Sequence, residues 1–179
     1  MQPGDVEAIA RLHGDLYEAE YGWSREFEEY VRRPLAEFAS RGGPRERIWI
    51  AEEDDGLIGC IAIVSTSDPE TAQLRWFLVH PRARGHGFGR DLLGRALAFC
   101  REQRYGRVIL WTVRGLDAAA RLYAAAGFVR TEESESKRWG AAVVEQRYEI
   151  DLTASHSRLG GCRNLPEPNE FGGPGERFG

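Results

Sequence analysis

Two stretches near the start of the chain carry apolar residues three and four positions apart, the spacing of one helix face. The first follows Gly4-Asp5 and contains Val6, Ile9, Ala10, His13 and Leu16. The second follows Ser24 and contains Phe27, Tyr30, Val31, Leu35 and Phe38. Pro34 lies inside the second stretch. Because proline lacks the backbone N–H that a helix interior needs, we expect this helix to kink or split near Arg33.

Six short stretches rich in β-branched and aromatic residues, separated by turn residues, predict strands. They cover residues 47–52, 57–65, 71–79, 107–113, 128–133 and 143–152. The stretch 57–65 is almost entirely apolar, so we expect it to be covered on both faces of a sheet. Helical spacing returns from Arg90 onward and again in the alanine-rich stretch 118–126, which Asp117 caps and Gly127 closes.

This order of elements predicts a single α/β domain over residues 1–152, with a mixed central sheet of about six to seven strands and flanking helices. From residue 153 to residue 179, glycine, proline and polar residues dominate without any period. Such a segment buries too little apolar surface to fold, so we expect a disordered C-terminal tail.

Composition narrows the classes of function. The chain has 179 residues and a formal net charge of −4, which argues against a general nucleic-acid-binding protein. No apolar run is long enough to span a membrane and the first residues lack the features of a secretory signal, so we expect a cytoplasmic protein. Cys60, Cys100 and Cys162 are scattered along the chain, which fits neither a disulfide framework nor a metal site.

A loop dense in glycine and arginine joins the predicted strand 71–79 to the helix that begins near Arg90. Its glycines are Gly85, Gly87 and Gly89, and its arginines are Arg82, Arg84 and Arg90. A strand, a glycine-rich turn and a helix N-terminus favour an anionic ligand, because the first helical N–H groups have no partner. The loop lacks the Gly-Lys-Ser/Thr ending of nucleoside-triphosphate loops, and it does not follow a first strand as dinucleotide loops do.

Two motifs make this loop specific. Arg84-x-x-Gly87-x-Gly89 after Val79-His80-Pro81 resembles the acyl-CoA pyrophosphate loop of the GNAT N-acetyltransferases. Downstream, the run from Ala119 to Phe128 resembles the A-x-x-L-Y-x-x-x-G-F helix of the same family. Residues 13–23 and the closing residues 138–152 are also similar to the acetyltransferase half of bacterial proteins that fuse a MarR-type regulator to a GNAT domain.

The resemblance implies roles for particular residues, with acetyl-CoA as co-substrate and no metal. The strand before the loop splays from its neighbour and its backbone pairs with the pantetheine arm, a role that falls on Phe77, Leu78 and Val79. The pyrophosphate would be held along the loop by Arg84, Gly85, His86, Gly87, Phe88, Gly89 and Arg90. Tyr123 matches the tyrosine that protonates the leaving thiolate. Leu116 stands where the family often has asparagine, so either Thr112 substitutes or that contact is absent.

The acceptor side is less defined by sequence. Gln73 stands where many GNATs have a glutamate base, which leaves Glu18, Glu20 and His13 as candidates. Tyr21 and Trp23 are candidates for the wall of the acceptor pocket.

Strand alternation predicts that Gln73, Arg75, Phe77 and Val79 share one face, the face that looks at the transfer site in GNATs. We expect Arg75 on that face either to bind an acceptor carboxylate with two hydrogen bonds or to form a salt bridge with an N-terminal glutamate.

These features favour an acetyl-CoA-dependent N-acetyltransferase that acts on a small-molecule amine, such as an amino acid, by direct transfer in a ternary complex. The alternative is a non-catalytic acyl-CoA-binding module that serves a transcriptional regulator. Antibiotic modification is a third reading, because residues 18–29 are rich in glutamate and would suit a cationic acceptor. Homodimers are common in the family, and the sequence selects no interface.

Overall fold

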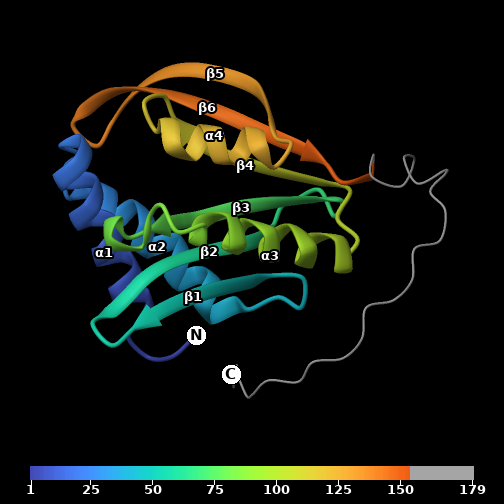
Figure 1. Cartoon of the computed structure of the whole chain (residues 1–179), viewed down its shortest axis with the longest axis horizontal. Helices are drawn as coiled ribbons and strands as arrows, with labels where there is room; N and C mark the ends of the chain where they lie inside the picture. Colours follow the sequence, from blue (N-terminus) through green and yellow to red (C-terminus); the bar gives the residue numbers. More distant parts are fainter. Residues whose placement is uncertain (154–179) are drawn as a thin grey trace.

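The computed structural model describes residues 1–153, in which six strands form one mixed sheet with the order β1-β2-β3-β4-β6-β5 (Figure 1). The strands are β1 (Arg47–Glu53), β2 (Gly56–Ser65), β3 (Thr71–Val79), β4 (Arg107–Val113), β5 (Val129–Arg138) and β6 (Ala141–Asp151). Neighbouring strands are antiparallel except β3 and β4, which are parallel. The predicted α/β domain with a mixed sheet is confirmed. The predicted tail, including Cys162, lies outside the described residues from 154 onward.

Four helices flank the sheet: α1 (Asp5–Tyr21), α2 (Glu26–Arg41), α3 (Phe88–Glu102) and α4 (Asp117–Ala125). α1 and α2 cover one face, whereas α3 and α4 cover the other (Figure 1). Of the two outcomes predicted near Arg33, the split does not occur, since the helix continues through Pro34, and the kink stays a prediction. Proline removes a single backbone bond, and the buried face of Phe27, Val31, Leu35 and Phe38 holds both halves against the sheet.

Two apolar cores lie on either side of the sheet, and β2 contributes to both. Ile61 and Ile63 point into the core beneath α3 and α4, whereas Cys60, Ala62 and Val64 point into the core beneath α1 and α2. The prediction that this strand is covered on both faces is therefore confirmed.

A β-bulge interrupts β3 at Trp76, whose φ of 46° is unusual for a residue with a side chain. The pairing with β2 passes from Ala62↔Arg75 to Cys60↔Leu78, so Trp76 and Phe77 together lie opposite Ile61 alone. From this point the alternation of side chains along β3 is shifted by one residue.

The bulge corrects the predicted arrangement of side chains along β3. Gln73 and Arg75 pair with β2 residues of the α1/α2 core and therefore lie on that face. Phe77 and Val79, after the bulge, pack against the core under α3 and α4. The expectation that all four share one face is wrong, because strict alternation fails wherever one strand has an extra residue.

The parallel strands β3 and β4 separate along their length. They pair only over Thr71–Gln73 and Arg107–Ile109, although both continue beyond these residues. A wedge therefore opens in the middle of the sheet, bordered by the C-terminal parts of both strands. This is the splay that the family resemblance implies.

Candidate active site

A cleft of about 910 Å³ occupies the wedge between β3 and β4. Its lining comes from α1, α2, the glycine loop, α4 and the turn between β5 and β6. Phe77 and Tyr123 line it from the α3/α4 face, whereas Tyr17 and Arg75 line it from the α1/α2 face. The cleft thus passes through the sheet and joins a chamber beside the glycine loop to a chamber beside α1 and α2.

The glycine loop presents a row of free backbone donors to the first chamber. Gly85 and Gly87 have φ angles of 85° and 83°, conformations that glycine adopts without strain. Within residues 1–153, none of the backbone N–H groups from residue 85 to residue 89 donates to a carbonyl. Five adjacent orphan donors at the N-terminus of the 15-residue helix α3 suit an anion such as a pyrophosphate.

The arginines around the loop have different surroundings. Arg84 donates from Nε to the Val79 carbonyl at 2.9 Å and from its two Nη atoms to Glu20, at 3.1 and 2.8 Å. Arg82 instead faces Asp55 at 3.4 Å, on the far side of the loop, and it does not line the cleft. Arg90 lines the cleft and forms no ion pair within the described chain. His86 does not line the cleft.

Tyr123 lines the cleft from the α3/α4 face of the sheet. α4 carries its ring into the core, where it contacts Phe77 at 6.2 Å and Tyr148 at 5.9 Å between ring centroids. Its hydroxyl has no hydrogen-bond partner among the described residues, and burial raises its pKa above the ordinary value. At neutral pH this phenol is therefore protonated, and burial makes it a weaker acid than a phenol in water.

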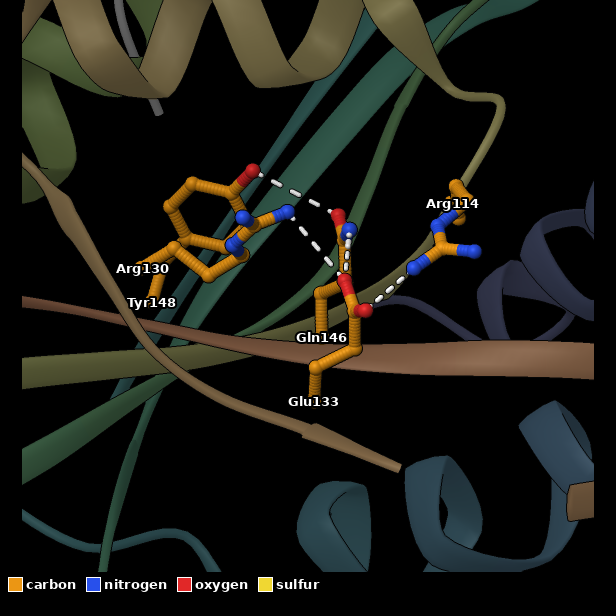
Figure 2. Close-up of polar contacts among 5 residues, drawn as sticks. All are labelled: Arg114, Arg130, Glu133, Gln146 and Tyr148. Atoms are coloured by element: carbon orange, nitrogen blue, oxygen red, sulfur yellow. Dashed lines mark hydrogen bonds and ion pairs between the residues drawn. The ribbon is translucent and has the colours of Figure 1, made fainter. Parts of the chain in front are cut away.

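A polar network supports Tyr123 from behind. Figure 2 shows the Glu133 carboxylate at its centre, approached by Arg114, Arg130 and Gln146. Gln146 donates to Glu133 at 2.7 Å and accepts from the Tyr148 hydroxyl at 3.4 Å. The bond from Gln146, followed by the charges of the arginines, lowers the pKa of Glu133. Sequence reasoning missed this network, because β5 looks like a fully solvated polar strand.

The second chamber is walled by aromatic rings. Trp23 stacks on Trp139 with centroids 4.5 Å apart, while Tyr17 lies 4.8 Å from Trp23 and Tyr30 lies 5.1 Å from Trp139. Trp139 lies in the turn between β5 and β6, and its carbonyl accepts from the Ser24 N–H at 2.9 Å. Trp23 and Tyr21 line the cleft, and their role as a wall for the acceptor stays a prediction. Trp139 and Tyr30 also line it, and sequence reasoning did not single them out.

Arg75 is a cation of the second chamber. Its guanidinium lies 4.7 Å from the centroid of Trp76, and burial lowers its pKa. No carboxylate of the described chain lies within salt-bridge distance, so the predicted alternative of a bridge to an N-terminal glutamate is not formed. A partly desolvated arginine without a carboxylate partner can bind an anionic group.

The predicted general bases are poorly placed to take a proton from an acceptor amine. Glu18 is exposed and does not line the cleft, and Glu20 is held by Arg84. His13 is buried and donates from Nδ1 to the Ile9 carbonyl at 2.8 Å. Burial lowers its pKa to about 4, so it is neutral and weakly basic at neutral pH.

Position 116 departs from the family pattern in structure as well as in sequence. Leu116 is the N-cap residue of α4 and makes no side-chain capping bond, whereas Thr112 lines the cleft. Among residues 1–153 no cluster of three or more potential metal ligands is present. No helix in the same range has the length and apolarity needed to cross a membrane.

Comparison with known proteins agrees with this geometry. The model of the acetyltransferase (GNAT) family matches residues 7–128. N-acetyltransferase 8B from Homo sapiens is 30% identical over 99 residues, which are 53% of this chain and 44% of that protein. N-acetylaspartate synthetase from Danio rerio is 33% identical over 87 residues, 49% of this chain and 31% of that protein. The chain therefore spans less than half the length of these curated relatives.

The fold is also shared with solved structures. The ribosomal-protein-alanine N-acetyltransferase from Brucella melitensis superposes with a TM-score of 0.66 at 20% identity. The alignment covers 85% of this chain and 97% of that one. At this identity the likeness concerns the fold alone.

Proposed function

Because the chain belongs to the acetyltransferase (GNAT) family, whose members use acetyl-CoA as co-substrate, we propose that it transfers the acetyl group to a small carboxylate-bearing amine. Transfer is direct, with both substrates held together in the cleft. The observation that carries this proposal is the wedge between β3 and β4, which ends at the five free N–H groups of the glycine loop. Such a wedge can hold an extended arm against the backbone of β3 and its phosphates at the loop.

The chemistry assigns one proton donor. The amine nitrogen forms a bond to the acetyl carbon while the carbon–sulfur bond breaks, and the leaving sulfur takes a proton from the Tyr123 hydroxyl. The phenol is restored by the proton that the nitrogen loses. Holding the reactants side by side supplies much of the rate, and proton donation adds a smaller part.

Arg75 and the charges of the cleft support a carboxylate-bearing acceptor. The lining carboxylates are Glu20, Asp117 and Glu145, of which Glu20 is paired with Arg84 and Glu145 with Arg138 at 3.3 Å. An acceptor with several positive charges, such as a polyamine or an aminoglycoside, would find little free negative charge here. An amino acid would instead place its carboxylate at Arg75.

The test is CoA-thiol release from acetyl-CoA with amino acids, polyamines and aminoglycosides as acceptors. We expect stimulation by amino acids, and we expect Tyr123→Phe to lower kcat by about tenfold to a hundredfold with little change in acetyl-CoA affinity. Tyr105→Phe is the matched control, because it removes the same atom from a tyrosine that is equally buried and does not line the cleft.

Acetyl-CoA binding without turnover by any amine would contradict the proposal. It would favour the non-catalytic acyl-CoA-binding module. That alternative is suggested by the resemblance to MarR–GNAT fusions and by Leu116, which stands where the family often has asparagine.

A further inference from the structure

Large exposed aromatic side chains gather at the cleft. Within residues 1–153 the exposed large apolar side chains are Met1, Tyr21, Tyr30, Trp111 and Val129. All three aromatic members of this group line the cleft, whereas Met1 and Val129 do not. Exposing an indole or phenol ring to water is costly, so rings collected in one cleft mark a surface that is covered when a ligand binds.

Trp111 stands on the same face of the sheet as Arg75. Gln73 of β3 pairs with Ile109 of β4, which places these two side chains and the alternate residues Trp111 and Val113 on the α1/α2 face. Val113 is buried in the core of that face, which agrees with this register. Trp111 is 45% exposed, and its ring contacts no other aromatic ring of the described chain. It therefore forms an open wall of the second chamber.

Tyr30 forms another wall of this chamber. Its ring centroid lies 5.1 Å from Trp139 and 6.0 Å from Phe27, yet 45% of the residue is exposed. Trp139 and Phe27 hold this ring in place. One cation and two half-exposed rings thus border the same chamber.

We propose that the acceptor is an aromatic amino-carboxylate, such as an aromatic amino acid. Its carboxylate binds Arg75 and its ring lies against Trp111 and Tyr30, with the amine directed toward Tyr123. This assignment rests on the proposed function and names the substrate class of the same site. An aliphatic amino acid would leave both rings in water. A dicarboxylate would need a second free cation in the same chamber. Arg138 is already paired with Glu145 at 3.3 Å, and Arg90, unpaired within the described chain, belongs to the glycine loop.

A binding experiment tests the assignment without requiring turnover. Calorimetric titration in the presence of CoA compares N-acetylphenylalanine with N-acetylalanine, which lacks the ring, and with N-phenethylacetamide, which lacks the carboxylate. We expect N-acetylphenylalanine to bind at least tenfold more tightly than either. Equal affinities, or no binding of any of the three ligands at millimolar concentration, would overturn the assignment.

Variants assign the two contacts to their residues. Trp111→Ala should remove most of the advantage of N-acetylphenylalanine over N-acetylalanine, and Trp111→Phe should restore part of it. Arg75→Gln should weaken N-acetylphenylalanine about tenfold to a hundredfold and leave N-phenethylacetamide unchanged. Val129→Ala is the matched control, since Val129 is 64% exposed and lies outside the cleft. An advantage of the aromatic ligand that persists in Trp111→Ala would overturn the assignment.

Turnover separates this inference from the proposed function. Release of CoA with phenylalanine above that with alanine supports both. Release with alanine or aspartate but not with phenylalanine retains the acetyltransferase and overturns the aromatic acceptor. If no amine stimulates release, the proposed function fails, and the binding experiment alone decides whether the chamber recognises an aromatic carboxylate.

Discussion

The histidine of α1 makes the folded state sensitive to acid. His13 is 3% exposed, and burial lowers its pKa from 6.5 to about 4. In the unfolded chain the same imidazole takes up a proton near its ordinary pKa. Between these two values the unfolded state binds more protons than the folded state, so the free energy of unfolding falls as pH is lowered from about 6.5 toward 4.

The size of this effect follows from the two pKa values. One unit of pKa difference between the folded and unfolded states corresponds to about 1.4 kcal/mol. The shift of His13 therefore lowers the free energy of unfolding by about 3 kcal/mol once the pH is low enough to protonate the imidazole in both states. The expected loss relative to pH 7 is about 2 kcal/mol at pH 5 and about 3 kcal/mol at pH 4. This is a large part of the stability of an ordinary domain.

Urea denaturation of the wild type and of His13→Leu, at several pH values from 4 to 7.5, measures the effect. Leucine cannot take up a proton, and it leaves the Ile9 carbonyl with its backbone partner in the helix. The stability difference between wild type and variant should therefore change by about 3 kcal/mol from pH 7 to pH 4. A difference that does not change with pH, or an imidazole that titrates near 6.5 by NMR in the folded protein, would refute the reasoning.

Three further predictions concern the loop, the network and the ion pair. Gly87→Ala should destabilise the fold by about 1–2 kcal/mol and weaken acetyl-CoA binding, because the φ of Gly87 is 83°. Gly94→Ala should instead stabilise the fold by about 0.5–1 kcal/mol, because Gly94 has open space around it at a regular helical position. If both variants changed the free energy of unfolding in the same direction, the prediction would be contradicted. Gln146→Leu should destabilise the fold in urea denaturation, since it leaves the buried Tyr148 hydroxyl without its acceptor, whereas the exposed Glu133 keeps Arg114 and Arg130. A neutral effect would mean that the bond from Tyr148 to Gln146 contributes nothing. Glu20→Gln should tighten acetyl-CoA binding a few-fold at low salt only, because the substitution frees Arg84 from its ion pair. Unchanged affinity in calorimetry would refute the idea that Glu20 and acetyl-CoA compete for Arg84.

Most secondary structure was predictable because it depends on neighbours in the chain. The apolar positions of α1 and α2 repeat at helical spacing, and the uniformly apolar run of β2 indicated a strand buried on both faces. Where a single residue suggested that a helix would split, packing could prevent it. Pro34 is the example, since burial of the α2 face outweighs one lost backbone bond.

The glycine loop was predictable for a related reason. Its conformation depends on glycines at positive φ and on the first turn of α3, and both are local properties of residues 85–91. Tyr123 was found through a motif, although its burial and its contact with Tyr148 depend on β6, which follows it in the chain. The glycine-loop chamber could therefore be outlined before the fold was seen.

The sequence by itself determined the elements, the mixed sheet and the glycine loop, because each follows from local periodicity or local backbone conformation. Tertiary structure alone decided the second chamber. The bulge at Trp76 places Arg75 on the face opposite Phe77, and the β5–β6 turn brings Trp139 against Trp23, more than a hundred residues earlier. The physical reason is that strand register and bulges, which no local pattern records, decide which side chains converge.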